Sequence, residues 1–129
     1  MMAKILLAED EKQIGDMISF KLINAGHQIV RAEDGERACA LAERERPDLI
    51  LLDAMMPSLS GFEVLRRIKA NPSLRGIPVI MVTAKGNERD VLTGLRGGAV
   101  DYIVKPFSLK ELSARVELAL RREPPATTP

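Results

Sequence analysis

Four charged side chains stand at or just after the ends of short apolar segments, and their types together suit phosphoryl transfer. They are Glu9, Asp10, Asp53 and Lys105. Carboxylates that share a pocket repel one another unless a cation is present, and Mg²⁺, a hard divalent ion with oxygen ligands, meets that need. A lysine on the other side of such an ion would neutralise the oxygens of a transferring phosphoryl group. Asp53 would then be the nucleophile and would form an acyl phosphate.

Thr83 and Ala84, at the end of a further apolar segment, add groups that could bind phosphoryl oxygens. Thr83 supplies a hydroxyl donor, and the strand-to-loop turn at Ala84 supplies backbone N–H groups. Taken alone, Thr83 is equally an ordinary β-branched strand residue, and Asp53 could simply cap the turn after its strand. Lys105 alone could be a solvated charge at a strand end. The fold must therefore show whether these residues meet.

The apolar segments alternate with stretches of helical spacing, and this alternation predicts the fold. The segments expected to form strands are residues 4–8, 28–32, 49–53, 79–83 and 101–105. Between and after them, apolar residues recur every three or four positions, as a helix that packs on one side requires. Such alternation needs right-handed crossovers and hence a parallel sheet with helices on both faces. We therefore expect an α/β fold with a doubly wound five-stranded parallel sheet and five helices.

In a doubly wound sheet of strand order 2-1-3-4-5, the segments that carry the candidate site residues become neighbours. Their carboxyl ends then lie along one edge, where open α/β sheets bind their ligands. Asp53 follows four consecutive apolar residues, 49–52, which is typical of a strand covered on both faces. The sequence thus predicts that the acidic residues, the threonine and the lysine converge on one crevice.

Helix ends are marked by local signals. Ser60 and Ser108 are each followed three positions later by a glutamate, which is the capping-box pattern. Asp34 and Asn87 are expected to cap two further helices. The glycines expected to end helices are Gly26, Gly97 and Gly98.

The composition is that of an ordinary soluble domain. The 129 residues are 46% hydrophobic and 29% charged, which excludes a disordered chain, and no apolar run approaches the roughly 20 residues that span a bilayer. We expect one domain over residues 1–122, a flexible tail or linker stub over 123–129, and a cytoplasmic location without membrane contact. A net charge of +1 and the absence of tryptophan argue against direct nucleic-acid binding.

Cys39, His27 and four methionines are expected to be structural. Cys39 stands among alanines and a leucine, cannot form an internal disulfide, and should be a small buried residue. His27, beside Gly26, should be exposed, since the chain lacks the ligands for a soft metal site. The methionines expected to pack in the interior are Met17, Met55, Met56 and Met81.

From Lys4 to about Arg122 the sequence resembles a response-regulator receiver domain, the phosphoacceptor module of two-component signalling, with a flavodoxin-like (CheY-like) fold. The matching pieces, in order, are Glu9-Asp10, Asp53 with Pro57, Gly61, Thr83-Ala84, and Tyr102 with Lys105-Pro106-Phe107. Each piece alone is common in unrelated proteins. Their order and spacing together are specific.

The resemblance implies a Mg²⁺-dependent phosphorylation site. Asp53 would accept the phosphoryl group, and Glu9, Asp10, Asp53 and the backbone carbonyl of Met55 would hold the ion. The donor would be the phosphohistidine of a sensor histidine kinase, or a small acyl phosphate. Beyond its own phosphorylation and dephosphorylation, the chain would not be an enzyme. The side chain of Met55 cannot orient an attacking water, so we expect a long-lived phosphoryl state.

The resemblance implies that the remaining matching residues bind the phosphoryl group or respond to it. Lys105 would pair with its oxygens, and Thr83 and the backbone at Ala84 would hydrogen-bond them. Tyr102 would be the switch aromatic that turns inward when Thr83 moves. The Lys105–Pro106 peptide bond is expected to be cis.

The C-terminal part, residues 105–116 with Arg121-Arg122, resembles the OmpR/PhoB group of transcription regulators. In that group a winged-helix DNA-binding domain follows the receiver, and active receivers dimerise through the fourth helix, the fifth strand and the fifth helix. Val91 and Val100 stand where a basic and an acidic residue are usual, which would change the ion pairs of that face. The charged positions of that face that the chain does match are Asp101, Glu111 and Arg115.

Other classes fit the residues less well. A phosphohydrolase resembling the haloacid dehalogenases needs a second acid two residues after its nucleophile, where this chain has Met55. A nucleotide-binding domain needs a glycine-rich loop after the first strand, where this chain has residues 9–12, Glu-Asp-Glu-Lys. A pseudo-receiver that acts without phosphorylation usually lacks the acceptor, the lysine or an acid, all of which are present. It remains an alternative, as does a stand-alone CheY-like receiver.

Overall fold

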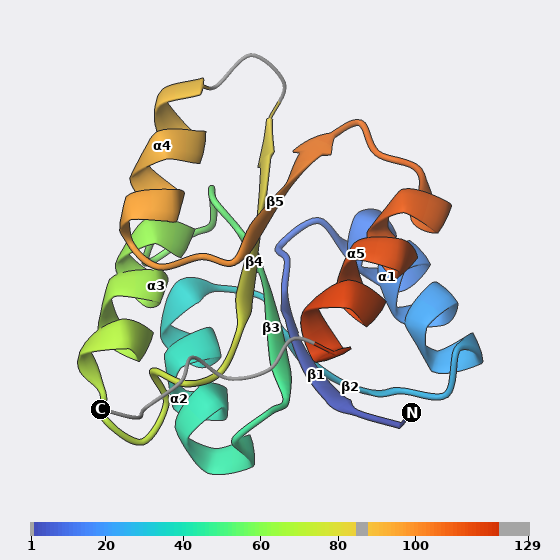
Figure 1. The fold of residues 1–129 in the computed structure, drawn as a ribbon, viewed down its shortest axis with the longest axis horizontal. Coiled ribbons are helices and arrows are strands. Elements are labelled where there is room, and N and C mark those ends of the chain that lie inside the picture. The colour runs from blue at the N-terminus through green and yellow to red at the C-terminus, as the bar shows by residue number, and fades with distance from the viewer. Residues whose placement is uncertain (1, 85–87, 122–129) are drawn as a thin grey trace.

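The structure, a computed structural model, describes residues 2–84 and 88–121. These residues form strands and helices in strict alternation (Figure 1). The elements are β1 (Lys4–Ala8), α1 (Lys12–Asn24), β2 (Gln28–Ala32), α2 (Gly35–Glu45), β3 (Leu49–Asp53), α3 (Gly61–Ala70), β4 (Val79–Ala84), α4 (Glu88–Arg96), β5 (Asp101–Lys105) and α5 (Leu109–Arg121). The cap predicted at Asn87 and the tail predicted over 123–129 lie outside the described residues.

The strands form one parallel sheet in the order β2-β1-β3-β4-β5, as the sequence predicted. All four neighbouring pairs are parallel, and β4 extends one residue further than expected, to Ala84. Four of the five strands lie side by side as β1-β3-β4-β5. Their carboxyl ends therefore share one edge, and the residues that follow them are brought together.

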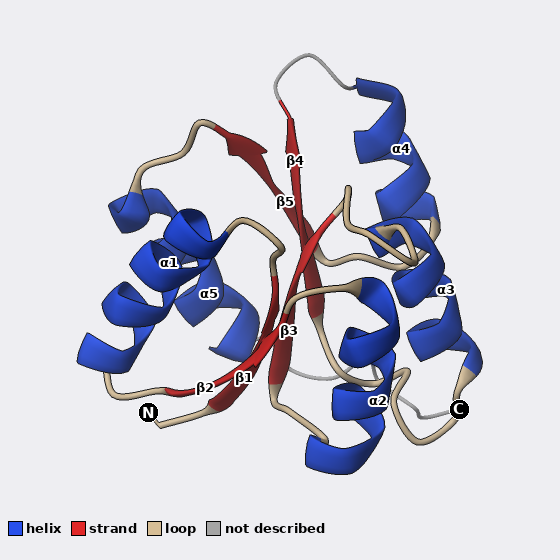
Figure 2. Ribbon diagram, turned by 180° about the vertical axis from the view of Figure 1, so that it is seen from behind, coloured by secondary structure: helices blue, strands red, loops and turns tan. Residues whose placement is uncertain are grey.

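Helices cover both faces of the sheet: α1 and α5 lie on one side, and α2, α3 and α4 on the other (Figures 1 and 2). The central strand β3 is buried along its whole length. Leu49 and Leu51 pack in the core under α1 and α5, and Ile50 and Leu52 in the core under α2 and α3. Each such buried side chain contributes roughly 1.5–3 kcal/mol, so β3 is a rigid support for Asp53.

The predicted helix starts are present, although the capping boxes are only half formed. Asp34 accepts a hydrogen bond from the backbone N–H of Arg37 at 2.8 Å. The hydroxyls of Ser60 and Ser108 likewise accept from N–H groups three residues on, at 3.2 and 2.9 Å. The glutamates at those positions instead bind arginines of their own helices, because a guanidinium offers stronger, charge-assisted hydrogen bonds. Gly26 and Gly98 adopt the positive φ expected after a helix.

Two of the four methionine predictions were wrong. Met81 is fully buried and Met56 packs against the core, whereas Met17 is 52% and Met55 69% exposed. Met17 lies on the outer side of α1, away from its buried residues, and Met55 lies in the loop after β3. Cys39 is half-buried against the core, and burial raises the pKa of its thiol, which fits the predicted structural role. Among the described residues, no helix is both long and apolar enough to cross a membrane.

The prediction of an exposed His27 was also wrong. Its side chain is completely buried in the loop between α1 and β2. Burial is tolerated because both ring nitrogens have partners: Nδ1 lies 3.1 Å from the backbone nitrogen of Ala3, and Nε2 lies 2.6 Å from Oε2 of Glu117.

Candidate functional site

The predicted site residues meet at the carboxyl edge of the sheet. Asp53 ends β3, Glu9 and Asp10 directly follow β1, and Lys105 ends β5. In the register of the sheet, Ala84 at the end of β4 lies opposite Lys105. The fold thus brings together groups that are up to about a hundred positions apart in the chain.

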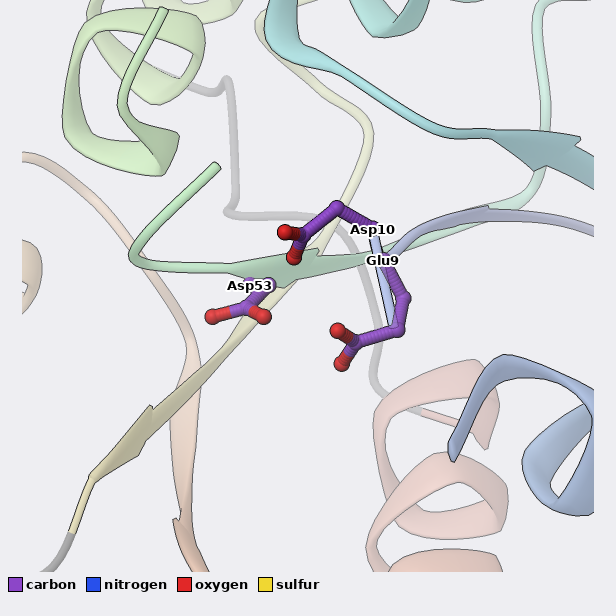
Figure 3. A group of neighbouring side chains, drawn as sticks. All are labelled: Glu9, Asp10 and Asp53. Carbon is purple, nitrogen blue, oxygen red and sulfur yellow. The ribbon is translucent and has the colours of Figure 1, made fainter. Parts of the chain in front are cut away.

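The three carboxylates form one cluster. Glu9, Asp10 and Asp53 each offer an oxygen, and these oxygens lie within 4.8 Å of one another. Figure 3 shows the three side chains around a common space, with Asp53 on β3 and the other two just after β1. Glu9 and Asp53 are only 1% and 5% exposed, whereas Asp10 faces solvent. Clustered carboxylate oxygens are the donor set that Mg²⁺ prefers, so these residues fit that ion.

Lys105 supplies the positive charge of the site. Its Nζ lies 3.1 Å from Oδ2 of Asp53, 3.4 Å from Oε1 of Glu9 and 3.6 Å from Oε1 of Glu11. Burial alone would lower the pKa of this lysine, but the surrounding carboxylates outweigh it and the pKa is raised. Lys105 therefore stays charged. The peptide bond that follows it, to Pro106, is cis as expected.

The negative charge of the cluster is only partly compensated. Burial, and then the hydrogen bond and charge of Asp53, raise the pKa of Glu9 to about 7, although the backbone N–H of Glu11 and the ammonium of Lys105 act in the opposite direction. Burial is the largest cause of this shift, and the part that comes from the Asp53 carboxylate is repulsion that an additional cation would offset. A divalent ion would restore the balance.

Asp53 is fixed in position by its own loop. Its Oδ1 accepts from the backbone N–H of Met55 at 3.1 Å, while Oδ2 accepts from Lys105. The loop then folds back so that Gly61 donates to the carbonyl of Ala54 at 2.9 Å. A Cβ at Gly61 would lie 2.2 Å from the carbonyl oxygen of Asp53, so only glycine permits this close approach.

Thr83 directly follows Val82, the residue that pairs with Asp53 in the sheet, and its hydroxyl is unused among the described residues. Thr83 is 2% exposed, and its Oγ1 has no hydrogen-bond partner among the described residues. A buried hydroxyl without a partner is costly and points to a ligand that would satisfy it. Tyr102, the predicted switch residue, is 9% exposed and lies with the core residues under α2 and α3.

Sequence reasoning missed one member of this site, Glu11. Its carboxylate contributes to the field around Lys105 from an exposed position. The signal was present, because Glu11 directly continues the acidic pair Glu9-Asp10. The carbonyl of Met55 as an ion ligand, and the roles of Ala84 and Tyr102, stay predictions.

Comparison with known protein families shows to which family this chain belongs. The response regulator receiver domain family matches residues 5–117, which include every site residue described above. The chain belongs to this family. Receiver domains generally bind Mg²⁺ at an acidic pocket, and the Glu9–Asp10–Asp53 cluster is an acidic pocket of this kind. Receiver domains of response regulators are phosphorylated by histidine kinases.

Curated relatives of this receiver include transcriptional regulators. It is 47% identical over 121 residues to the phosphate regulon transcriptional regulatory protein PhoB of Pseudomonas aeruginosa, covering 94% of this chain and 53% of that one. It is 44% identical over 119 residues to the alkaline phosphatase synthesis transcriptional regulatory protein PhoP of Bacillus subtilis, covering 92% and 49%. The chain thus spans about half the length of the curated relatives it matches.

Solved structures share the whole fold of this receiver. The chemotaxis response regulator CheY4 of Vibrio cholerae superposes with a TM-score of 0.87 at 31% identity, covering 92% of this chain and 99% of that one. The receiver domain of the Francisella response regulator 1452 gives a TM-score of 0.86 at 34% identity, covering 93% and 98%. The predicted fold and the resemblance stated from the sequence are both confirmed.

Proposed function

We propose that this chain is a phosphoacceptor switch in which Asp53 takes a phosphoryl group from a histidine kinase. One observation carries the proposal: the Asp53 carboxylate is held between the Lys105 ammonium and the acidic pair Glu9-Asp10, beside a buried threonine hydroxyl that has no partner among the described residues. A structural aspartate would need neither the extra carboxylates nor the unused donor.

The chemistry is an in-line displacement at phosphorus. A carboxylate oxygen of Asp53 forms the new bond, the phosphorus–nitrogen bond of a donor phosphohistidine breaks, and the departing imidazole nitrogen keeps the electron pair. Mg²⁺ held by Glu9, Asp10, Asp53 and the Met55 carbonyl would stabilise the charge that develops on the phosphoryl oxygens. Lys105, 3.1 Å from the nucleophilic carboxylate, stabilises the same charge from the chain itself.

After transfer, the hydroxyl of Thr83 would donate to a phosphoryl oxygen, assisted by the backbone N–H at Ala84. This contact would give the buried hydroxyl the partner it lacks among the described residues. Movement of Thr83 would let the ring of Tyr102 take up the vacated space, and the surface formed by α4, β5 and α5 would change. Replacing Thr83 by alanine should therefore leave phosphorylation intact and uncouple it from any change of this surface.

The output is control of transcription, through a domain of the kind implied by the regulators that this chain partly matches. The phosphorylated receiver would pair with a second copy through α4, β5 and α5. On that face Arg115 already binds Asp101 at 2.9 Å and Glu111 at 3.2 Å within one chain. We propose that the only reactions the chain catalyses are its own phosphorylation and dephosphorylation.

The first test is the intact mass of the chain after incubation with acetyl phosphate and Mg²⁺. We expect a gain of one phosphoryl group that disappears when Mg²⁺ is chelated and in Asp53→Ala. Asp48→Ala is the matched control, because Asp48 is an exposed aspartate just before the same strand. An unchanged mass in the unmodified chain would instead favour a pseudo-receiver.

A further inference from the structure

A second buried ionisable cluster lies outside the phosphoryl site. The His27 side chain is fully buried and joins two segments on either side of it: Ala3, just before β1, and Glu117 on α5. Ala3 and His27 precede β1 and β2, so this cluster lies at the amino end of the parallel strands, opposite the phosphoryl site.

The hydrogen bonds of this cluster have only one possible direction. A backbone N–H can only donate, so Nδ1 of His27 must carry a lone pair to accept from Ala3 at 3.1 Å. The hydrogen of the neutral ring therefore lies on Nε2, which donates to Oε2 of Glu117 at 2.6 Å. One ring thus forms a complete bridge from the start of the sheet to α5.

The backbone around His27 makes the bridge rigid. Its own N–H donates to the carbonyl of Leu22 in α1 at 3.1 Å, and the next residue, Gln28, donates to the carbonyl of Ala3 at 2.8 Å. Glu117 directly follows Val116, which is a fully buried residue of α5 itself. The bridge therefore fastens the C-terminal half of α5 to α1 and to the first two strands at once.

The helix on the other side of the proposed output surface has no comparable anchor in the part of the chain that the structure describes. In α4, every described side chain is exposed, namely Arg89, Leu92, Thr93, Leu95 and Arg96. The hydroxyl of Thr93 bonds only within its own helix, to the carbonyl of Arg89 at 2.8 Å. Among the side chains that the structure describes, α4 thus offers no counterpart to the His27 bridge of α5.

We propose that the His27 bridge makes the C-terminal half of α5 the fixed side of the output surface, so that this half of the helix keeps its place when Asp53 is phosphorylated. This inference rests on the proposed function for its second half. Its first half, that the bridge holds α5, is a property of the unmodified chain.

Hydrogen exchange measured by mass spectrometry on the full chain tests both halves. Glu117→Leu removes the acceptor for His27, Glu117→Gln keeps an acceptor of the same shape without the charge, and Lys110→Leu removes another exposed charge from α5. Before phosphorylation, we expect exchange over residues 113–121 to rise about tenfold in Glu117→Leu, which corresponds to the loss of one charge-assisted hydrogen bond. The rise should be smaller in Glu117→Gln, which keeps a neutral hydrogen bond, and absent in Lys110→Leu.

Exchange after treatment with acetyl phosphate and Mg²⁺ tests the regulatory half. In the wild type we expect changes over residues 79–105 and none over 113–121, whereas in Glu117→Leu the change should spread into 113–121. Peptides from α2 and α3 report global unfolding and should not differ among the variants.

Two results would overturn the inference. One is normal protection of residues 113–121 in Glu117→Leu, and the other is an equal response of this segment to phosphorylation in the wild type and in Glu117→Leu. If no phosphoryl group is gained at all, the proposed function fails and the regulatory half with it. The comparison in the unmodified chain still decides whether the bridge holds α5.

Discussion

Two buried polar clusters lie at opposite ends of the sheet, and they differ in how completely their atoms are paired. At the amino end, both ring nitrogens of His27 have a partner, within 3.1 and 2.6 Å. At the carboxyl end, Glu9 and Asp53 face one another with a single lysine between them, and the hydroxyl of Thr83 has no partner among the described residues. The first cluster is complete as it stands, whereas the second needs additional charge.

This difference in pairing indicates that the His27 cluster serves the stability of the fold and the Asp53 cluster serves its function. A fully paired buried cluster stabilises a fold, because breaking any bond exposes an unsatisfied group to the interior. Like charges and an unpaired donor in a buried site cost stability, and they persist where a ligand completes them. Substitutions should therefore have opposite effects at the two ends.

The largest expected effect is on phosphorylation, in Lys105→Met. Without the ammonium, the charge that develops on the phosphoryl oxygens loses its fixed partner on the chain, and we expect the rate of phosphoryl gain from acetyl phosphate to fall about 100-fold. Intact mass against time measures this rate. Lys110→Met, a change of an exposed lysine on α5, should leave it unaltered. Equal rates in the two variants would contradict the role given to Lys105.

The next effect is on stability, in His27→Ala. The substitution leaves a cavity and removes the ring that pairs with both Ala3 and Glu117, so the free energy of unfolding should fall by about 3 kcal/mol. Urea denaturation measures it. Gln28→Ala, at the exposed neighbouring position, should change it by less than about 0.5 kcal/mol. A loss as small as that of the control would mean that the bridge contributes nothing.

At the acidic cluster the ionised side chains should lower the stability of the fold, whereas the His27 bridge raises it. The pKa of Glu9 is about 7 in the folded chain and 4.5 without its surroundings, so the folded chain retains a proton that the unfolded chain gives up. In the absence of Mg²⁺, the free energy of unfolding should therefore fall by about 2–3 kcal/mol as the pH rises from about 4.5 to about 7.

Glu9→Gln should remove this pH dependence, and Mg²⁺ should stabilise the wild type at about pH 8 because it binds only the folded chain. Urea denaturation over this pH range, with and without the ion, provides the measurement. A wild type whose stability rises with pH through this window would contradict the account of the cluster.

The smallest effect concerns the lifetime of the phosphoryl group. The exposed Met55 offers no hydrogen bond to an attacking water, and Met55→Asn would supply one, so hydrolysis should be faster by about fivefold. Loss of the phosphoryl mass over time measures this, with the equally polar change Met17→Asn on α1 as the control. An unchanged lifetime would exclude a role for this position.

The carboxyl-end cluster was predictable from the sequence because each of its residues is marked by the apolar residues just before it. Glu9, Asp53 and Lys105 each mark the end of an apolar strand segment, and the topology of a parallel sheet brings such ends together. The serine and aspartate caps were predictable because a cap and its partner are three residues apart.

The amino-end cluster was not predictable in this way. Glu117 is 90 residues from His27, and no spacing rule connects them. A lone histidine beside a glycine looks like an exposed loop residue until α5 is placed over it. The exposure of Met17 could have been predicted, because it lies about 100° around α1 from the buried Ile18.

The central claim is that Asp53 is the group that takes the phosphoryl group, and chemical trapping tests it most directly. Borohydride reduces an acyl phosphate on an aspartate to homoserine, so the chain would be treated with acetyl phosphate and Mg²⁺, reduced, digested and sequenced by tandem mass spectrometry. The account predicts homoserine at position 53 and at no other aspartate. A reduced residue at Asp10, or none in a chain that has gained phosphoryl mass, would contradict it.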